Sequence, residues 1–318
     1  MNKVLNIILI SLFSLTVISC AKKSSDDSKT NTDNTTSSGL FVAVGAAGTL
    51  LTSSDGTTWN AQTSGTSNNL RAVAYGNSIL VVVGYSGTVL RSTDGTTWND
   101  ATALSTTTDN LTNVTYGNST FMAVGGSGTI ITSSDGIQWT SKTSGTSENL
   151  WGIAYGNSTW VANGDNGTII SSSDGTSWDN RTSGTTVEFN GLLYGNSTFV
   201  AVGDSGTILT SDNGTTWTSK TSGTSNEIRE VIYDRNIFFG VGEDATYIYS
   251  QNGTSWSSGS STGIDASAYL SGVAYGLETW VIVGASGVIY TIKDEETAYT
   301  LRTSGTTEHL RRVYSLVE

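Results

Sequence analysis

Three arginines and one tryptophan stand at equivalent positions of a short segment that recurs along the chain. The segment reads LRAVAY at residues 70–75, and its second residue differs from copy to copy while its neighbours recur. A guanidinium forms paired hydrogen bonds with a carboxylate, and an indole ring stacks on cations. We therefore expect Arg71, Trp151, Arg229 and Arg311 to form a site for a carboxylate or a sugar. The alternative is that each arginine only pairs with a neighbouring glutamate.

Carboxylates follow the second strand expected in several copies of the repeat, and glutamates precede the first. A glycosidase needs two carboxyl groups about 5–9.5 Å apart, one of them with a raised pKa. The residues around them are chiefly Thr, Ser and Gly, so the sequence offers no apolar pocket that would raise a pKa. We expect these residues to form an acidic rim that could bind a cation or a basic partner, or else to be solvated charges on turns. They are Asp165, Asp204, Glu243 and Asp244, joined by Glu148, Glu188, Glu227 and Glu308.

Other classes of site are excluded by composition. The 318 residues include one histidine, His309, and one cysteine, Cys20. A multi-histidine or cysteine-based metal site and an intramolecular disulfide are therefore excluded, and no Ser-His-Asp arrangement stands out. The formal net charge of −12 disfavours nucleic acid, whose phosphates attract Lys and Arg. We expect no catalytic residue, no metal and no cofactor.

A repeat that occupies the chain from Leu40 onward must position these residues. In one unit, residues 189–221, four short apolar and β-branched runs alternate with turns that contain Gly or Asn. This pattern predicts a four-stranded antiparallel meander, and units of about 40 residues arranged radially form a propeller. The period is marked by tryptophans at intervals of 39 to 41 residues: Trp59, Trp98, Trp139, Trp178, Trp217 and Trp256.

The two ends of the repeat region complement each other. The first unit begins at residues 40–45 without its first strand, and the chain finishes with an extra first strand at residues 310–317. Together they complete a seventh blade, and pairing between them closes a ring and removes the exposed edges. The sequence therefore predicts an all-β, seven-bladed propeller over residues 39–318, with an open solenoid of seven repeats as the alternative.

Asp-Gly and Asn-Gly pairs recur between the third and fourth strands of the first six units. Both central positions of a two-residue type I′ turn need positive φ, which Gly and Asn tolerate. We therefore expect a tight hairpin there. In the seventh unit the turn is longer and acidic, and Tyr299 replaces the tryptophan.

The first 38 residues differ from the repeat. Residues 1–20 have one basic residue and an apolar run from Ile7 to Ile18, which indicates an export signal too short for a membrane span. Residues 17–20, VISC, resemble a bacterial lipobox, in which Cys20 carries a lipid; the alternative is an ordinary signal with a buried cysteine. Residues 21–38 contain no large apolar side chain and are expected to form a flexible tether. Since Ala21 is not aspartate, the resemblance implies the outer membrane or cell surface.

The recurring turn resembles the Asp-box of the bacterial neuraminidase repeat (BNR) families, and residues 40–318 resemble propellers similar to the photosystem II assembly and stability factor. The box fits fully at Thr210 to Trp217, with Asp212, Gly214 and Trp217, and is offset by one residue at Trp59, Trp98, Trp139 and Trp178. The resemblance implies a structural role, in which the polar side chain bonds turn amides and the tryptophan packs between blades.

These observations predict a monomeric, lipid-anchored binding or assembly module at the cell envelope, without enzymatic activity. Its expected ligands are proteins or glycans. Propellers of this kind include both enzymes and binding proteins, so the fold alone does not choose between them. The alternatives are a carbohydrate-active hydrolase that uses the acidic loops, or a spacer without a fixed ligand.

Overall fold

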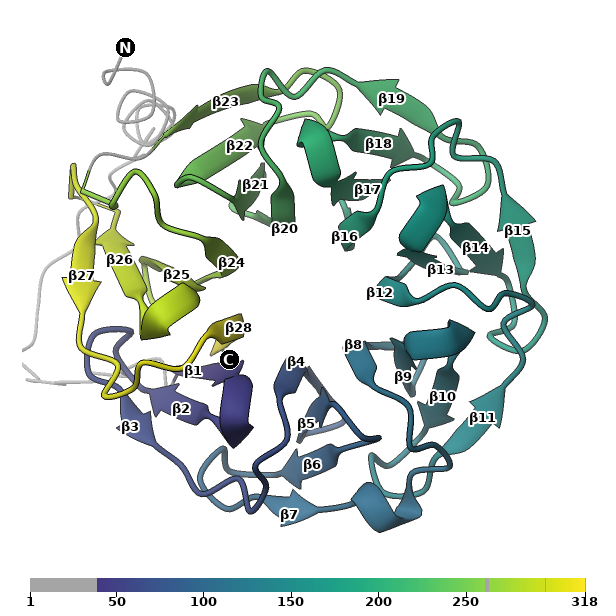
Figure 1. Cartoon of the computed structure of the whole chain (residues 1–318), viewed down its shortest axis with the longest axis horizontal. Helices are drawn as coiled ribbons and strands as arrows, with labels where there is room; N and C mark the ends of the chain where they lie inside the picture. Colours follow the sequence, from purple (N-terminus) through teal and green to yellow (C-terminus); the bar gives the residue numbers. More distant parts are fainter. Residues whose placement is uncertain (1–38, 261–262, 295, 318) are drawn as a thin grey trace, which may run out of the picture.

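Seven four-stranded antiparallel sheets surround a common axis in the computed structural model of the chain, which describes residues 39–260, 263–294 and 296–317 (Figure 1). The predicted all-β seven-bladed propeller is confirmed. The expected signal, tether and lipidated Cys20 lie outside the described residues. No helix in the described ranges is long and apolar enough to cross a membrane.

Each blade places its first strand nearest the axis and its fourth strand at the rim (Figure 1). The first strands are β4 (Leu70–Gly76), β8 (Leu111–Gly117), β12 (Leu150–Gly156), β16 (Phe189–Gly195), β20 (Ile228–Asp234), β24 (Leu270–Gly276) and β28 (Leu310–Val317). The second strands are β1 (Gly39–Gly45), β5 (Ile79–Gly84), β9 (Thr120–Gly125), β13 (Thr159–Gly164), β17 (Thr198–Gly203), β21 (Ile237–Gly242) and β25 (Thr279–Gly284).

The outer half of each blade is shorter. The third strands are β2 (Leu50–Ser53), β6 (Val89–Ser92), β10 (Ile130–Ser133), β14 (Ile169–Ser172), β18 (Ile208–Ser211), β22 (Thr246–Ser250) and β26 (Ile289–Lys293). The fourth strands are β3 (Asn60–Ala61), β7 (Asn99–Asp100), β11 (Thr140–Lys142), β15 (Asp179–Arg181), β19 (Thr218–Lys220), β23 (Ser257–Ser260) and β27 (Thr300–Arg302). Short 3-10 turns follow some second strands at η1 (Ala46–Gly48), η3 (Gly126–Gly128), η4 (Asp165–Gly167), η5 (Asp204–Gly206) and η6 (Ala285–Gly287), and η2 (Thr102–Leu104) follows β7.

The ring closes as the chain ends predicted. Strand β28 pairs antiparallel with β1, and their sheet has the order β28-β1-β2-β3. We number this sheet blade 1, and blades 2 to 7 follow in chain order from β4–β7 to β24–β27. Because the last strand completes the first blade, every blade has two neighbours to pack against.

Apolar side chains between neighbouring blades hold the ring together. Trp217 and Phe199 of blade 5, for example, share a cluster with Val161 of blade 4, and their ring centroids lie 6.4 Å apart. Trp59 and Trp139 are 9% and 3% exposed, and each contacts the cluster between its own blade and the preceding one. Burying each such ring contributes about 2 kcal/mol or more.

A tyrosine-on-glycine contact repeats near the axis. The first strands of blades 2 to 5 end in glycine, and the tyrosine of the next blade lies against that glycine. A Cβ atom built on Gly156 would stand 2.0 Å from Cγ of Tyr194, and one on Gly76 would stand 2.1 Å from Cγ of Tyr116. The recurring Tyr-Gly pair therefore sets the spacing of the innermost strands.

The turn between the third and fourth strands is an acceptor-centred loop. In blade 1, Asp55 Oδ1 accepts hydrogen bonds from the main-chain N–H groups of Thr57 and Thr58, both at 2.7 Å, and from the Ser53 hydroxyl at 3.0 Å. The equivalent acceptors in blades 2 to 6 are Asp94, Asp135, Asp174, Asn213 and Asn252.

This arrangement corrects two expectations. In blade 5 the turn amides bond Asn213, and the exposed Asp212 lies one residue earlier, so all six turns share one register. Positive φ occurs at Gly56 but not at Asp55. The two-residue turns with positive φ at both positions instead join first and second strands, as at Asn77 (φ 49°) and Ser78 (φ 59°). Asn-Ser was thus the hairpin signal, because Asn also tolerates positive φ.

An ion pair crosses the axis and ties the closing strand to two other blades. Arg312 of β28 bonds the carboxylate of Glu230 in β20, and that carboxylate also accepts a 2.8 Å hydrogen bond from the Val273 amide in β24. Glu230 is only 7% exposed. Burial raises the pKa of Glu230, which Arg312 opposes.

We expect Glu230→Gln to destabilise the protein by about 3–5 kcal/mol, because the Arg312 charge would stay buried without its partner. The double variant Glu230→Gln/Arg312→Met should recover much of this loss, since it removes both charges. Chemical unfolding of the wild type, both single variants and the double variant measures the coupling. Additive losses would show that the pair does not tie the blades.

The turn aspartates predict a specific acid sensitivity. The amides of Thr97 and Thr96 lower the pKa of Asp94, and turn amides likewise lower the pKa of Asp135 and Asp174. For Asp55, burial acts to raise the pKa, but the hydrogen bonds of the turn outweigh it and the pKa is lowered. A carboxylate whose pKa is lower in the folded protein than in the unfolded chain, where it is about 3.9, stabilises the fold at pH values above that unfolded pKa. This contribution is lost as the pH falls below the unfolded pKa and through the folded pKa.

Replacing all four aspartates with asparagine should therefore flatten the fall in unfolding free energy between about pH 5 and pH 2. Blades 5 and 6 already use asparagine at this position, so the change preserves the turn. Urea unfolding at each pH measures the effect, and Asp212→Asn is the matched control. Equal pH slopes in the wild type and the fourfold variant would contradict the assignment.

Candidate functional site: the arginine mouth

The seven variable positions of the repeat converge at one end of the central channel. A pocket there is lined by all seven of them: Arg71, Thr112, Trp151, Asn190, Arg229, Ser271 and Arg311, together with Tyr269 and Arg312. We call this set the arginine mouth. Sequence reasoning named four members as candidate ligand-binding residues, and the structure brings those four together.

A one-residue bulge in each first strand positions these side chains. In blade 2, Leu70 pairs with Gly84 and Ala72 pairs with Val83, so Arg71 is left out of the ladder. The same shift leaves out Trp151, Arg229 and Arg311. Leu70 is fully buried and anchors the strand beside the bulge. A bulge redirects the extra residue, which explains why its type is free of the packing rule of the blade.

Arg71 is held by aromatic rings rather than by acids. Its guanidinium carbon lies 5.6 Å from the ring centroid of Tyr85 and 5.5 Å from that of Trp151. Trp151 is fixed in turn, because its Nε1–H donates to Asp165 Oδ1 at 2.5 Å. Asp165 therefore positions the tryptophan that packs on the arginine.

Arg229 has the acidic partner that the alternative interpretation expected. Its Nη2 lies 2.5 Å from Glu227 Oε1, its Nη1 donates to Asn190 Oδ1 at 3.2 Å, and its guanidinium carbon lies 4.9 Å from the Tyr269 ring centroid. This arginine is neutralised within the protein.

Arg71 and Arg311 lack such neutralisation. Neither forms a hydrogen bond or an ion pair with any residue in the described part of the chain, and the Nε atoms of both are buried without a partner. Burial lowers the pKa of Arg71 to about 10, and burial also lowers the pKa of Arg311. Both stay protonated at neutral pH, so two uncompensated cations face the same small pocket.

His309 reports this positive field. Burial lowers its pKa to about 4, with further contributions from Arg311, Arg71 and Arg229. Its Nε2 lies 2.6 Å from the Ser271 hydroxyl, and its ring stands edge-on to Tyr269. Sequence reasoning missed this hydrogen bond because the two residues are far apart in the chain.

The acidic rim is only partly assembled. Asp204 Oδ1 and Glu227 Oε1 each accept a 3.0 Å hydrogen bond from Asn190 Nδ2, so an amide stands between these two carboxylates. Glu243 and Asp244 are exposed and do not line the mouth. No group of three His, Cys, Asp or Glu in the described ranges is placed to hold a metal ion.

The sequence offered no setting that would raise the pKa of these carboxylates, and for two glutamates this expectation is wrong. Burial raises the pKa of Glu188, and the charges of Asp165 and Asp204 raise it further. Burial also raises the pKa of Glu227, against the opposing charge of Arg229. The sequence around each glutamate is polar, and the charges that act on Glu188 include those of Asp165 and Arg229 from other blades, so the local sequence did not reveal the shift.

Because His309 is the only histidine, its titration can be followed as one NMR resonance. We expect a pKa of about 4 in the wild type. Arg311→Gln and Arg71→Gln should each raise this pKa while leaving it below about 6.5, since burial persists. Arg181→Gln, at the outer rim, is the control. An unchanged pKa in the mouth variants would show that the arginines do not set the local field.

Comparisons with known proteins support the architecture. No protein-family model matches the chain, and no curated protein matches it. Among solved structures, YCF48 bound to D1 peptide is 18% identical with a TM-score of 0.64, over 79% of this chain and 87% of that one. YCF48 from Cyanidioschyzon merolae is 18% identical with a TM-score of 0.62, over 80% and 91%. The computationally designed Ika8 protein is 15% identical with a TM-score of 0.60, over 85% and 90%. The chain therefore shares its propeller fold with the photosystem II assembly factor YCF48.

Proposed function

We propose that this protein is a non-catalytic binding module whose arginine mouth binds a carboxylate-bearing segment of a partner protein. The observation that supports this most directly is the pair Arg71 and Arg311, two half-buried cations whose Nε atoms are buried and which have no acidic partner among the described residues. Leaving such charges uncompensated costs stability, and perturbed groups of this kind gather at functional sites. A bound carboxylate would supply the missing acceptors.

The geometry suits recognition better than simple charge attraction. Tyr85 and Trp151 flank the guanidinium of Arg71, so this guanidinium is presented in one orientation. A pre-oriented arginine loses less conformational entropy when it bonds a planar carboxylate. The overall charge of −12 opposes nucleic acid or a broadly acidic surface, so we propose a local anionic group on an otherwise uncharged or basic partner.

Structural neighbours supply a precedent for a peptide ligand. YCF48, which has this fold, is described as bound to D1 peptide. At 18% identity this likeness extends to the fold, and we propose the same class of ligand, a protein segment, from the chemistry of the arginine mouth. Glycans are the second class of ligand that this mouth could take.

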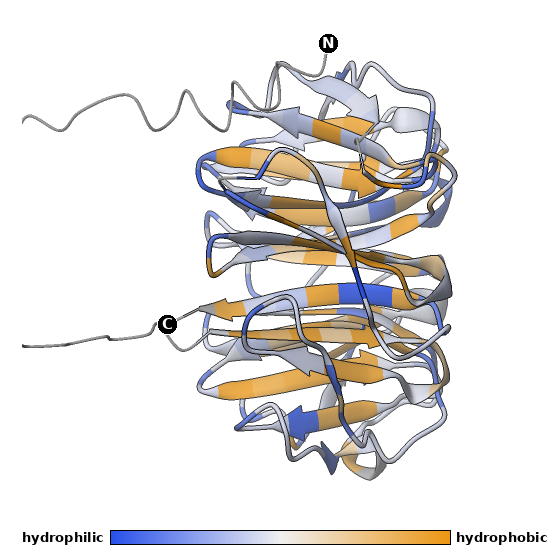
Figure 2. Ribbon diagram, turned by 90° about the vertical axis from the view of Figure 1, so that its left-hand side faces the viewer, coloured by the Kyte–Doolittle hydropathy of each residue, from blue (hydrophilic) through white to orange (hydrophobic). Residues whose placement is uncertain are grey.

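The direction in which the chain enters the propeller bears on which way the arginine mouth would face. Gly39 pairs with Val317, whereas Gly45 pairs with Leu310 beside the arginine mouth, so the chain enters at the opposite face. Figure 2 shows β28 running between these two faces. We propose export through residues 1–20, lipid attachment at Cys20 and a tether at 21–38, on the outer membrane or cell surface. The arginine mouth would then face away from the membrane. We also propose that the protein is a monomer and that it is related to the BNR repeat proteins.

A carbohydrate-active hydrolase is the second candidate, favoured by the raised pKa values of Glu188 and Glu227. Two carboxylates with different environments are the requirement for glycoside cleavage. However, the amide of Asn190 fills the space between Asp204 and Glu227, and Arg229 pairs with Glu227. Both carboxylates are therefore already bonded by neighbouring side chains, so we prefer binding.

Affinity capture from solubilised envelope, followed by binding measurements with the purified partner, tests the proposal. We expect Arg71→Gln/Arg311→Gln to weaken binding at least about tenfold, because each lost charged hydrogen bond contributes roughly 1.5–3 kcal/mol. Arg181→Gln/Arg302→Gln removes the same charge outside the mouth and should leave the affinity unchanged. Undiminished binding by a folded mouth variant would contradict the proposal. Glycoside turnover abolished by Glu188→Gln or Glu227→Gln would favour the hydrolase instead.

A further inference from the structure

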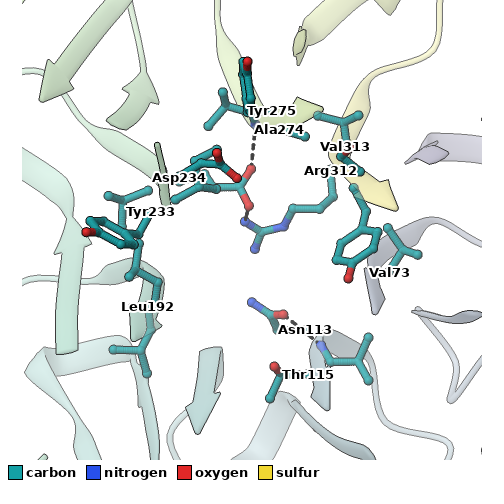
Figure 3. Close-up of a pocket in the computed structure, with 18 of the residues that line it drawn as sticks. Val73, Asn113, Thr115, Leu192, Tyr233, Asp234, Ala274, Tyr275, Arg312 and Val313 are labelled. Carbon is teal, nitrogen blue, oxygen red and sulfur yellow. Dashed lines mark hydrogen bonds and ion pairs between the residues drawn. The ribbon is translucent and has the colours of Figure 1, made fainter. Parts of the chain in front are cut away.

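A second chamber occupies the other end of the channel, beyond the Arg312–Glu230 ion pair. Its volume is about 340 Å³, within the range of roughly 300–1,000 Å³ that small-molecule sites occupy. Figure 3 shows Arg312 reaching across it, with Asn113 and Thr115 on the facing side. Arg312 lines both this chamber and the arginine mouth, so it forms the partition between them.

Irregularities of the repeat shape this chamber. Val81 pairs with Ala74 and Leu80 with Tyr75 in blade 2, whereas the equivalent pairs in blade 1 are Val42 with Tyr314 and Phe41 with Ser315. Ser315 therefore stands where the other six first strands have tyrosine. In blade 6, Asp234 stands where the other complete first strands of blades 2 to 7 end in glycine. Both departures place a small polar side chain on the chamber wall.

Several polar groups in the chamber have unused hydrogen-bonding capacity. The Ser315 hydroxyl is buried without a partner, and Thr115 forms no side-chain hydrogen bond with the described residues. Among the described residues Arg312 bonds Glu230 alone, which leaves other guanidinium N–H groups free to donate. Asp234 has no ion pair within 4.0 Å in the part of the chain that the structure describes, and its carboxylate, which the Arg235 amide bonds, keeps acceptor positions for a further donor.

The wall also offers apolar contact on all sides. Each first strand contributes at least one aliphatic side chain to the chamber, among them Val73, Ile153 and Leu192. A ligand that fits must therefore combine C–H surface with several hydroxyl groups.

The charges disfavour an ionic ligand. Glu230 already neutralises Arg312, and Asp234 adds a negative charge, so an anion would be repelled. The positive charge of the neighbouring Arg235 already acts on Asp234, which weakens the attraction of this carboxylate for a cation. A mixture of hydrogen-bond donors and acceptors suits neutral hydroxyl groups, which both donate and accept.

We propose that this chamber binds a neutral sugar ring, independently of the arginine mouth. Asp234 accepts hydrogen bonds from ring hydroxyls, Arg312 and Thr115 bond other hydroxyls, and the aliphatic side chains pack against the C–H face of the ring.

The test uses the full chain and four probes, glucose, galactose, mannose and N-acetylglucosamine, at millimolar concentration in saturation-transfer NMR and calorimetry. We expect at least one sugar to bind. Asp234→Asn should weaken that binding about tenfold, through loss of charged hydrogen bonds. Ser315→Tyr should abolish it by filling the chamber. Asp212→Asn and Ser219→Tyr make the same changes at exposed positions and should have no effect.

Three results would overturn the proposal. One is that none of the four sugars binds to folded wild type. Another is that binding persists in Asp234→Asn, a variant that conserves shape and is expected to fold even if Ser315→Tyr does not. The third is that methylamine binds in place of the sugars and loses affinity in Asp234→Asn, which would assign the chamber to cations. Arg71→Gln/Arg311→Gln should leave sugar binding unchanged, which separates this chamber from the arginine mouth.

Discussion

The antiparallel pairing of β28 with β1 is the interaction on which the rest of the structure depends. It joins the last strand of the chain to the first, so the seven blades close into a ring instead of ending at two exposed edges. Closure directs one side chain from each innermost strand toward a common axis. Seven positions separated by about 40 residues thereby become neighbours in one pocket.

The polar side chains fall into two groups with opposite energetics. In the turns, Asp55 and its equivalents have their acceptors filled by turn amides and a serine hydroxyl, so each loop is internally satisfied. At the arginine mouth, two guanidinium groups have aromatic neighbours or none, and their acceptors are missing. The repeated residues thus stabilise the fold, and the residues that depart from the repeat are the ones left with unused binding capacity.

The Arg312–Glu230 pair divides the channel into two different environments. On one side lies the positive pocket of Arg71 and Arg311. On the other lies a chamber with aliphatic walls, in which Glu230 offsets the charge of Arg312 and Asp234 adds a carboxylate. Because both residues stand where most blades have glycine or another small side chain, the pair fills space that the repeat leaves open. Two departures from the repeat, Glu230 in β20 and Arg312 in β28, therefore separate two possible sites within one ring.

Much of the fold was predictable because its signals are local and repeated. The period of the tryptophans, the turn residues and the complementary ends determined the blade count and the closure, and the convergence of Arg71, Trp151, Arg229 and Arg311 followed from the period. Their partners were not predictable in the same way. Whether an arginine is neutralised depends on atoms from other blades: Glu227 reaches Arg229, whereas Arg71 meets Tyr85 and Trp151. The pairing of Ser271 with His309, the ion pair of Arg312 with Glu230 and the raised pKa of Glu188 likewise arise between strands far apart in sequence.

The sequence by itself determined the ring and which positions face its axis, since backbone pairing and apolar period are local properties. Only the tertiary structure decided which of those charges are satisfied, because desolvation and ion pairing depend on distances across the ring.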